Sequence, residues 1–249
     1  MRKFPLAVLI AVCACAAHAD EVTLIAPGGI RAPIQKMIPD FERKTGHTVK
    51  ATFGSGNGTK KQVMSGEAFD VPIVQLPLAE VIATGHVIPA TETPLATVAI
   101  ALAVRKGAPK PDISTPDALK KTLLAAKSIA FPDGARGAAA GVSFDQTLKT
   151  LGIAEQMQSK ITRAQGGALS MEMLAKGEVE IGLTFLSEIH DPGVEVVGIL
   201  PREISTPTAL VGFVSTKAKS PEAAKALLKY LSGPEAAVVY KAVGMQAGK

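Results

Sequence analysis

The stretch APGGIRAPI, residues 26–34, lies between a short apolar run at 22–25 and a segment at 33–45 whose apolar residues are three and four positions apart. The first pattern predicts a buried strand and the second an amphipathic helix. Two glycines at this handover let the backbone approach a bound molecule without a side chain in the way. The unpaired N–H groups of the helix start favour an anion there. The stretch therefore predicts an α/β unit with an anion site in its loop.

Further units of strand, loop and helix follow along the chain. Strands are predicted at 49–53 and 71–75, and the small-residue loop GSGNGT, residues 54–59, connects the first of them to a helix. Such alternation is typical of an α/β fold with a mostly parallel sheet flanked by helices.

The pattern changes near residue 95. A long apolar strand at 97–104, TVAIALAV, is followed by a proline-rich loop and a second series of strands and helices. This change predicts two α/β lobes connected by crossing segments near 96–101 and 194–200. The expected boundaries assign residues 20–96 and 200–249 to lobe 1 and residues 97–199 to lobe 2.

The first nineteen residues, MRKFPLAVLIAVCACAAHA, have a basic start, an apolar middle and an A-x-A end. This is the pattern of a secretory signal peptide, so we expect the mature chain to begin at Asp20 and to work in the periplasm. Both cysteines, Cys13 and Cys15, lie in the signal, which leaves the mature chain without a disulfide or a thiol ligand. A lipid anchor on Cys15 is an alternative that the preceding residues match poorly. No later apolar run approaches the ~20 residues of a membrane span, and we expect a soluble protein.

Charge and composition argue against several functions. The formal net charge is +5, no basic block occurs, and the chain has no tryptophan and two tyrosines, so we expect no nucleic-acid partner. The histidines after the signal, His47, His86 and His190, do not have metal-ligand spacing, and we expect no metal and no cofactor. A nucleophile elbow and a P-loop are also absent. No catalytic residue is therefore assigned from motifs.

Several longer stretches resemble one known family. FGSGNGT at 53–59, GAAAGVSFDQTLKTLG at 137–152 and YLSGPEAAVVYKAVG at 230–244 are similar, in this order, to the periplasmic molybdate-binding proteins, which have the type II periplasmic binding-protein fold. The resemblance covers nearly the whole mature chain. It implies two lobes, each a mostly parallel sheet flanked by helices, that close over a ligand by a hinge movement.

The sequence departs from the family pattern at the positions that would hold molybdate. Gly29 and Gly56 stand where the family presents serine hydroxyls, and Phe185 stands where it presents a tyrosine. Arg31 and Arg136 add positive charge, and arginine is suited to bidentate pairing with planar carboxylates. We therefore expect the ligand to be a small organic anion, a di- or tricarboxylate, rather than molybdate.

Four small-residue loops, at 26–31, 54–59, 132–143 and 164–168, are expected to meet around this ligand. Each choice has a structural alternative: Arg31 can be a solvated side chain, and Ser55 and Asn57 can be turn or helix-cap residues. The candidate ligand-binding residues are Gly28, Gly29, Arg31, Ser55, Gly56, Asn57, Arg136, Ala140, Gln165 and Phe185.

Two functions stay open at this point. The first is an exported, monomeric binding protein that encloses a small anionic ligand and delivers it to a membrane transporter. The alternative is aconitate isomerase, an exported enzyme similar to the molybdate-binding proteins, which would interconvert cis- and trans-aconitate by allylic proton transfer without a cofactor. Its general base would be Glu188 or His190, which follow the strand carrying Phe185, although a hinge or surface role fits both residues equally well.

Overall fold

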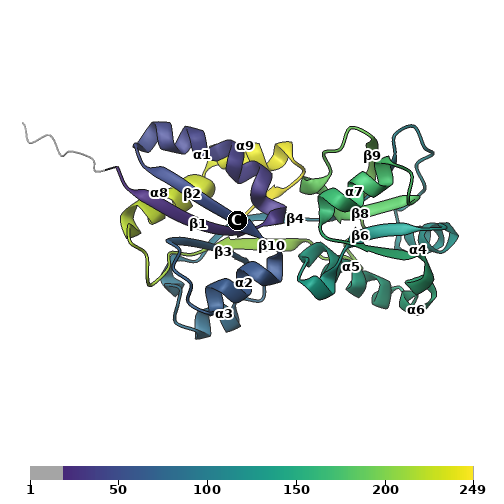
Figure 1. Ribbon diagram of the computed structural model, residues 1–249, viewed down its shortest axis with the longest axis horizontal. Coiled ribbons are helices and arrows are strands. Elements are labelled where there is room, and N and C mark those ends of the chain that lie inside the picture. Colours follow the sequence, from purple (N-terminus) through teal and green to yellow (C-terminus); the bar gives the residue numbers. More distant parts are fainter. Residues whose placement is uncertain (1–18, 249) are drawn as a thin grey trace, which may run out of the picture.

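The computed structural model describes residues 19–248, so the expected signal peptide, residues 1–19, lies outside the described residues except for its last one. The described chain forms two lobes that lie side by side along the long axis of the molecule (Figure 1). The expected two-lobed α/β fold is confirmed. Within residues 19–248, no helix is both long enough and apolar enough to cross a membrane.

Lobe 1 is built on a six-stranded sheet with the order β11-β4-β10-β3-β1-β2. β1 pairs parallel with β2 and β3, whereas β10 is antiparallel to both β3 and β4, and β11 is antiparallel to β4. The strands are β1 (Glu21–Pro27), β2 (Thr48–Gly54), β3 (Val71–Gln75), β4 (Thr93–Val98), β10 (Thr208–Gly212) and β11 (Gln246–Ala247).

Lobe 2 is built on a five-stranded sheet with the order β7-β6-β8-β5-β9. β6 is parallel to β7 and β8, and β5 is antiparallel to β8 and β9. The strands are β5 (Ile100–Arg105), β6 (Ile129–Pro132), β7 (Ile161–Ala164), β8 (Ile181–Phe185) and β9 (Val194–Ile199).

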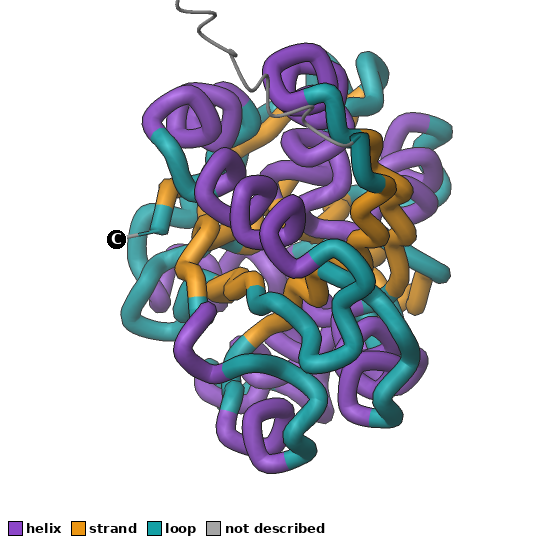
Figure 2. Tube along the Cα trace, turned by 90° about the vertical axis from the view of Figure 1, so that its left-hand side faces the viewer, coloured by secondary structure: helices purple, strands orange, loops and turns teal. Residues whose placement is uncertain are grey.

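Helices lie on both sides of the strands, as the view from the lobe 1 end shows (Figure 2). Those of lobe 1 are α1 (Arg31–Thr45), α2 (Gly56–Met64), α3 (Ala79–Ala83), α8 (Pro221–Leu231) and α9 (Pro234–Ala242). Those of lobe 2 are α4 (Pro116–Ala125), α5 (Ala139–Thr150), α6 (Ala154–Met157) and α7 (Gly167–Ala175). Short 3-10 turns are η1 (Gly28–Ile30), η2 (Pro89–Thr91), η3 (Gly134–Arg136), η4 (Gln158–Lys160) and η5 (Leu186–Glu188).

The strands that carry the chain between the lobes correct two details of the prediction. Each sheet is mixed rather than mostly parallel, because the crossing strands enter it antiparallel. The single strand predicted at 97–104 is in fact two strands, with β4 ending at Val98 and β5 beginning at Ile100. β4 belongs to the sheet of lobe 1 and β5 to the sheet of lobe 2, so the strand hydrogen bonding is interrupted at Ala99, where the chain passes from one lobe to the other. The chain returns to lobe 1 through residues 200–207, between β9 and β10.

Helix α1 shows how the sequence positions a loop for binding. Ile34, Met37 and Phe41 are buried on one face of the helix, which the three- and four-residue spacing predicts. Gly46 ends the helix in the left-handed conformation, at φ 77°, and its N–H donates to Glu42 O. Since the buried face fixes the helix against the sheet, the start of α1 is held at the carboxyl end of β1.

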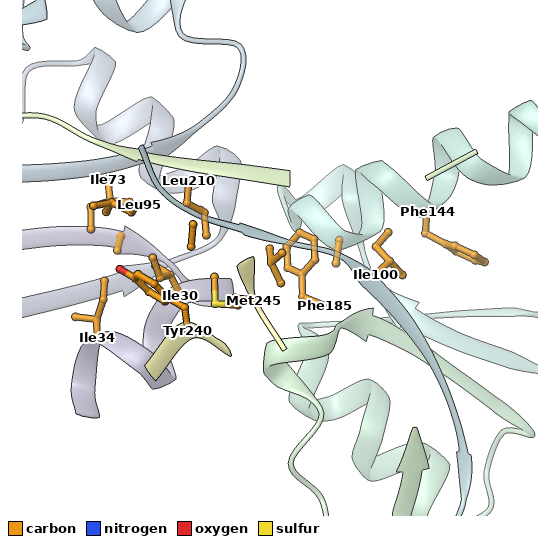
Figure 3. Packing of buried hydrophobic residues seen from close by; sticks show 14 of the residues in the cluster. Ile30, Ile34, Ile73, Leu95, Ile100, Phe144, Phe185, Leu210, Tyr240 and Met245 are labelled. Atoms are coloured by element: carbon orange, nitrogen blue, oxygen red, sulfur yellow. The ribbon is translucent and has the colours of Figure 1, made fainter. Parts of the chain in front are cut away.

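The apolar core runs from one lobe into the other. Buried side chains form a continuous cluster across the crossing strands (Figure 3). Its members include Ile34, Ile73 and Tyr240 in lobe 1, Met245 and Phe185 at the junction, and Ile100 and Phe144 in lobe 2. The junction is therefore a packed apolar contact as well as a pair of backbone connections.

Asp70, just before β3, joins three segments of lobe 1. Its buried carboxylate accepts hydrogen bonds from the backbone N–H and the hydroxyl of Thr23, at 2.8 and 2.6 Å, and from the N–H groups of Lys219 and Ser220, at 2.5 and 3.3 Å. Burial alone would raise the pKa of Asp70, but the hydrogen bonds from Thr23, Ser220 and Lys219 lower it overall. The ionised carboxylate thus holds the start of β1 and the segment before α8 against β3.

We predict that Asp70→Asn lowers the free energy of unfolding by about 2–3 kcal/mol at pH 7, because an amide turns an NH₂ group toward backbone donors. Since the folded pKa lies below the unfolded value near 3.9, the wild-type advantage is present above about pH 4 and is lost as pH falls through the folded pKa. Urea unfolding at pH 7 and pH 3 measures both effects. The exposed control Asp117→Asn should change stability by no more than about 1 kcal/mol. Equal stability of Asp70→Asn and wild type at pH 7 would contradict this role.

Candidate functional site

A cleft of about 640 Å³ lies between the two lobes. Its walls are the loops that follow β1 and β2 and the end of β3 in lobe 1, and the loops that follow β6, β7 and β8 in lobe 2. The helices α1, α2, α5 and α7 begin at this cleft. This is the arrangement that the loop pattern of the sequence predicts for an α/β fold.

The structure brings eight of the ten predicted binding residues into the cleft lining. They are Gly28, Gly29, Arg31, Ser55, Gly56, Ala140, Gln165 and Phe185. The two acid–base nominees, Glu188 and His190, line the same cleft. Ligand contact by these residues stays a prediction.

Asn57 and Arg136 lie outside the cleft lining, contrary to expectation. Asn57 is exposed, and its N–H donates to Gly137 O of the other lobe, at 3.1 Å. Arg136 is exposed at the end of η3. Gly137 then turns the chain with a positive φ of 93°, so the cleft wall is formed by the alanines that follow and not by the arginine.

The lobes touch on both sides of the cleft. On one side Asn57 N–H donates to Gly137 O; on the other, the Ser187 hydroxyl donates to Gly29 O, at 2.7 Å. Phe185 lies so near Gly29 that a Cβ on this glycine would be 2.9 Å from the Phe185 ring. A side chain at position 29 would therefore require Phe185 to shift, and the two lobes are in direct contact in this structure.

Among the described residues, helices α1, α5 and α7 have no side-chain cap, and α5 and α7 present free N–H groups to the cleft. No side chain within residues 19–248 caps the start of α5 or α7, and the first N–H groups of a helix have no partner inside it. Ala139 and Ala140 begin α5, and Gly167 and Ala168 begin α7; all four line the cleft. Ser55 differs, because its hydroxyl oxygen accepts from Gly58 N–H and so serves as the N-cap of α2. The cleft thus offers backbone donors suited to an anion.

Arg31 supplies positive charge at the edge of the cleft. Its guanidinium carbon lies 5.3 Å from the centre of the Phe53 ring, a cation–π contact. It forms no ion pair with a carboxylate among the described residues. A cation in the first turn of a helix is unfavourable for the helix dipole, and an anionic ligand would offset this.

Glu188 is the acidic group of the cleft. Its Oε2 accepts a hydrogen bond from the Thr184 hydroxyl at 2.5 Å, and its carboxyl packs against the backbone of Gly167 and Gly28. Burial raises the pKa of Glu188, although Thr184, Arg31 and His190 each act in the opposite direction. Glu188 lies beside a cation and the starts of helices. Because its pKa is raised, it can take up and release a proton at a pH nearer to neutral than the carboxyl of an ordinary glutamate can.

Gln75 was missed by the sequence analysis. It is the last residue of β3, the residue as a whole is 6% exposed, and it lines the cleft. Its Nε2 is the one buried side-chain nitrogen or oxygen of the described chain without a hydrogen-bond partner. The rule that ligands gather at the carboxyl ends of strands could have identified this residue, because a single polar residue ends the strand VPIVQ.

The described residues contain no group of three or more His, Cys, Asp or Glu side chains that could hold a metal ion.

Comparison with known proteins gives a consistent result. Residues 22–246 match the family described as bacterial extracellular solute-binding protein. An aconitate isomerase of Pseudomonas sp. is 32% identical over 236 residues, covering 90% of this chain and 87% of that protein. The molybdate-binding protein ModA of Azotobacter vinelandii is 30% identical over 236 residues, covering 93% and 92%. The solved structure of the Azotobacter vinelandii periplasmic molybdate-binding protein superposes with a TM-score of 0.75 at 19% identity, covering 90% of this chain and 98% of that one.

Proposed function

Because the chain belongs to the bacterial extracellular solute-binding proteins, we propose that its cleft encloses a small organic di- or tricarboxylate. The observation that carries this proposal is Arg31, a guanidinium at the cleft that lacks a carboxylate partner among the described residues. A guanidinium presents two parallel N–H groups that match the two oxygens of a carboxylate.

The hydroxyl groups of the cleft argue against a tetrahedral oxyanion. Gly29, Gly56 and Phe185 have no hydroxyl to donate. The hydroxyls of Thr184 and Ser187 are already used, since they donate to Glu188 and to Gly29 O. The remaining neutral donors are backbone N–H groups at the starts of helices, the O–H of Ser55 and the amides of Gln35, Gln75 and Gln165.

The size of the cleft also supports an organic ligand. A volume of about 640 Å³ is in the range of sites for organic small molecules. A tetrahedral oxyanion would fill a small part of this space. A tricarboxylate could place one carboxylate near Arg31 and another at the helix starts of lobe 2.

In this mechanism the ligand binds to one lobe and the second lobe closes over it. The contacts Asn57–Gly137 and Gly29–Ser187 would form on closure and hold the lobes together. The protein would work outside the cytoplasm as a monomer and present the closed, loaded form to a membrane transporter.

We predict that the chain from Asp20 is stabilised by carboxylates and not by molybdate. At about 100 times its dissociation constant, a ligand adds about 2.7 kcal/mol, which corresponds to roughly 5–10 °C in Tm for a chain of this length. A thermal-shift panel of citrate, cis- and trans-aconitate, tricarballylate, malate, molybdate, tungstate and sulfate measures this. A shift with molybdate and none with the carboxylates would overturn the proposal.

A second prediction compares the two arginines. Arg31→Ala should weaken the best carboxylate by about 2 kcal/mol, or about 30-fold in Kd, without changing the Tm of the unliganded protein by more than a few degrees. Arg136→Ala is the matched control, because Arg136 lies in the neighbouring glycine loop but outside the cleft lining. Isothermal titration calorimetry distinguishes them. Equal affinities of wild type and Arg31→Ala would remove the carboxylate argument.

Aconitate isomerase is the second candidate function, and Glu188 is the observation that favours it. In that reaction a base takes a proton from the methylene carbon, the charge spreads over the allylic carboxylate system, and the proton returns at the other end of that system. Glu188 would be the base, and Arg31 with the N–H groups of Ala140 and Gly167 would stabilise the developing negative charge. The 32% identity to an aconitate isomerase supports this candidate as well.

The third prediction tests this chemistry in deuterated buffer. If the protein is the isomerase, it converts trans-aconitate to cis-aconitate with incorporation of solvent deuterium. Glu188→Gln should then lower the rate by about 10²- to 10⁴-fold while trans-aconitate still binds. Glu155→Gln, exposed on α6, is the control and should react like wild type. Saturable binding of trans-aconitate by the wild type without exchange would eliminate the enzyme and leave the binding protein.

A further inference from the structure

Gln75 has an amide that the fold itself does not use. Its side chain is buried at the end of β3, and Nε2 has no acceptor within residues 19–248. An unsatisfied buried donor costs free energy, so such groups are rare unless they serve a purpose. Because Gln75 lines the cleft, a ligand oxygen can supply the missing acceptor.

The surroundings of Gln75 are small residues that make room for its amide. A Cβ on Gly56 would collide with Gln75 Oε1 and would lie 2.9 Å from Ala139 Cβ of the other lobe. Because residue 56 is a glycine, the Gln75 amide can occupy the space that a side chain there would fill. Rotation about the last side-chain torsion exchanges Nε2 and Oε1, so the donor can follow a ligand oxygen.

Gln75 and Arg31 are separated across the lobe 1 sheet. The Arg31 guanidinium lies over Phe53 of β2, Gln75 ends β3, and β1 runs between these two strands. Neighbouring strands are about 4.8 Å apart, which puts the two backbone positions roughly 10 Å apart. A ligand with two carboxylates could therefore contact both residues, with one carboxylate at each.

We propose that Gln75 is a ligand-binding residue that donates Nε2–H to a second carboxylate of the ligand, separate from the carboxylate held by Arg31. This inference rests on the proposed binding of a di- or tricarboxylate and assigns it a specificity residue. Ligands with two or more carboxylates would be selected because Arg31 and Gln75 each bind one carboxylate.

The test replaces Gln75 with Met, which keeps the length of the side chain and removes both polar atoms. The unliganded Tm of Gln75→Met should be at least that of wild type, because an unsatisfied buried donor is lost. Its Kd for trans-aconitate, measured by calorimetry, should rise about 10- to 100-fold, the value of a hydrogen bond to a charged group. Gln156→Met, exposed on α6, is the control and should match wild type in both measurements. Gln75→Glu should bind more weakly still, since it places a negative charge against the ligand.

The outcomes separate this inference from the proposed function. If wild type binds trans-aconitate and Gln75→Met binds it equally well, the role of Gln75 is overturned while the function stands. A drop of several degrees in the unliganded Tm of Gln75→Met would also overturn it, because the amide would then be structural. If wild type binds molybdate, tungstate or sulfate but no carboxylate, the proposed function fails, and unchanged binding of that anion by Gln75→Met rejects Gln75 as well. Binding of none of these anions overturns both.

Discussion

The cleft depends on the approach of two backbone segments, the turn at Gly29 in lobe 1 and the turn at Ser187 in lobe 2. The Ser187 hydroxyl donates to Gly29 O, and the Phe185 ring lies where a side chain at position 29 would have to go. A Cβ at this position would lie 2.9 Å from the Phe185 ring, so a side chain here would require the ring to shift. Neither Gly29 nor Phe185 offers a hydroxyl donor to the cleft, and the two residues pack against each other instead.

The same relation holds on the other side of the cleft. Gly56 has no side chain, and the amide of Gln75, at the end of β3, occupies the space that a side chain at position 56 would need. The result is a site whose neutral donors are backbone N–H groups, the Ser55 hydroxyl and the amides of Gln35, Gln75 and Gln165, with Arg31 and Glu188 as its charged groups. In the function proposed above, this set would hold a planar anion with several carboxylates. It also contains a carboxyl of raised pKa, so binding and proton transfer are both within its chemical reach.

Much of this could be read from the sequence, and the exceptions have physical reasons. The alternation of strands, loops and helices and the glycine loops predicted the two lobes and most of the cleft, because these patterns are local. The break at Ala99 was missed, since TVAIALAV is uniformly apolar and strand pairing is not local. Arg31 and Arg136 look alike in sequence and are both exposed, but Arg31 lines the cleft and Arg136 lies outside its lining. Gln75 was taken as part of a buried strand, because an unpartnered amide becomes visible only when its neighbours in space are known.

The most direct test is a crystal structure of the chain from Asp20 grown with equal concentrations of trans-aconitate and molybdate, with diffraction recorded at the molybdenum absorption edge. The account predicts an organic acid in the cleft, with one carboxylate on the Arg31 guanidinium and another on the Gln75 amide, and no anomalous signal there. A strong molybdenum peak between the lobes would contradict it.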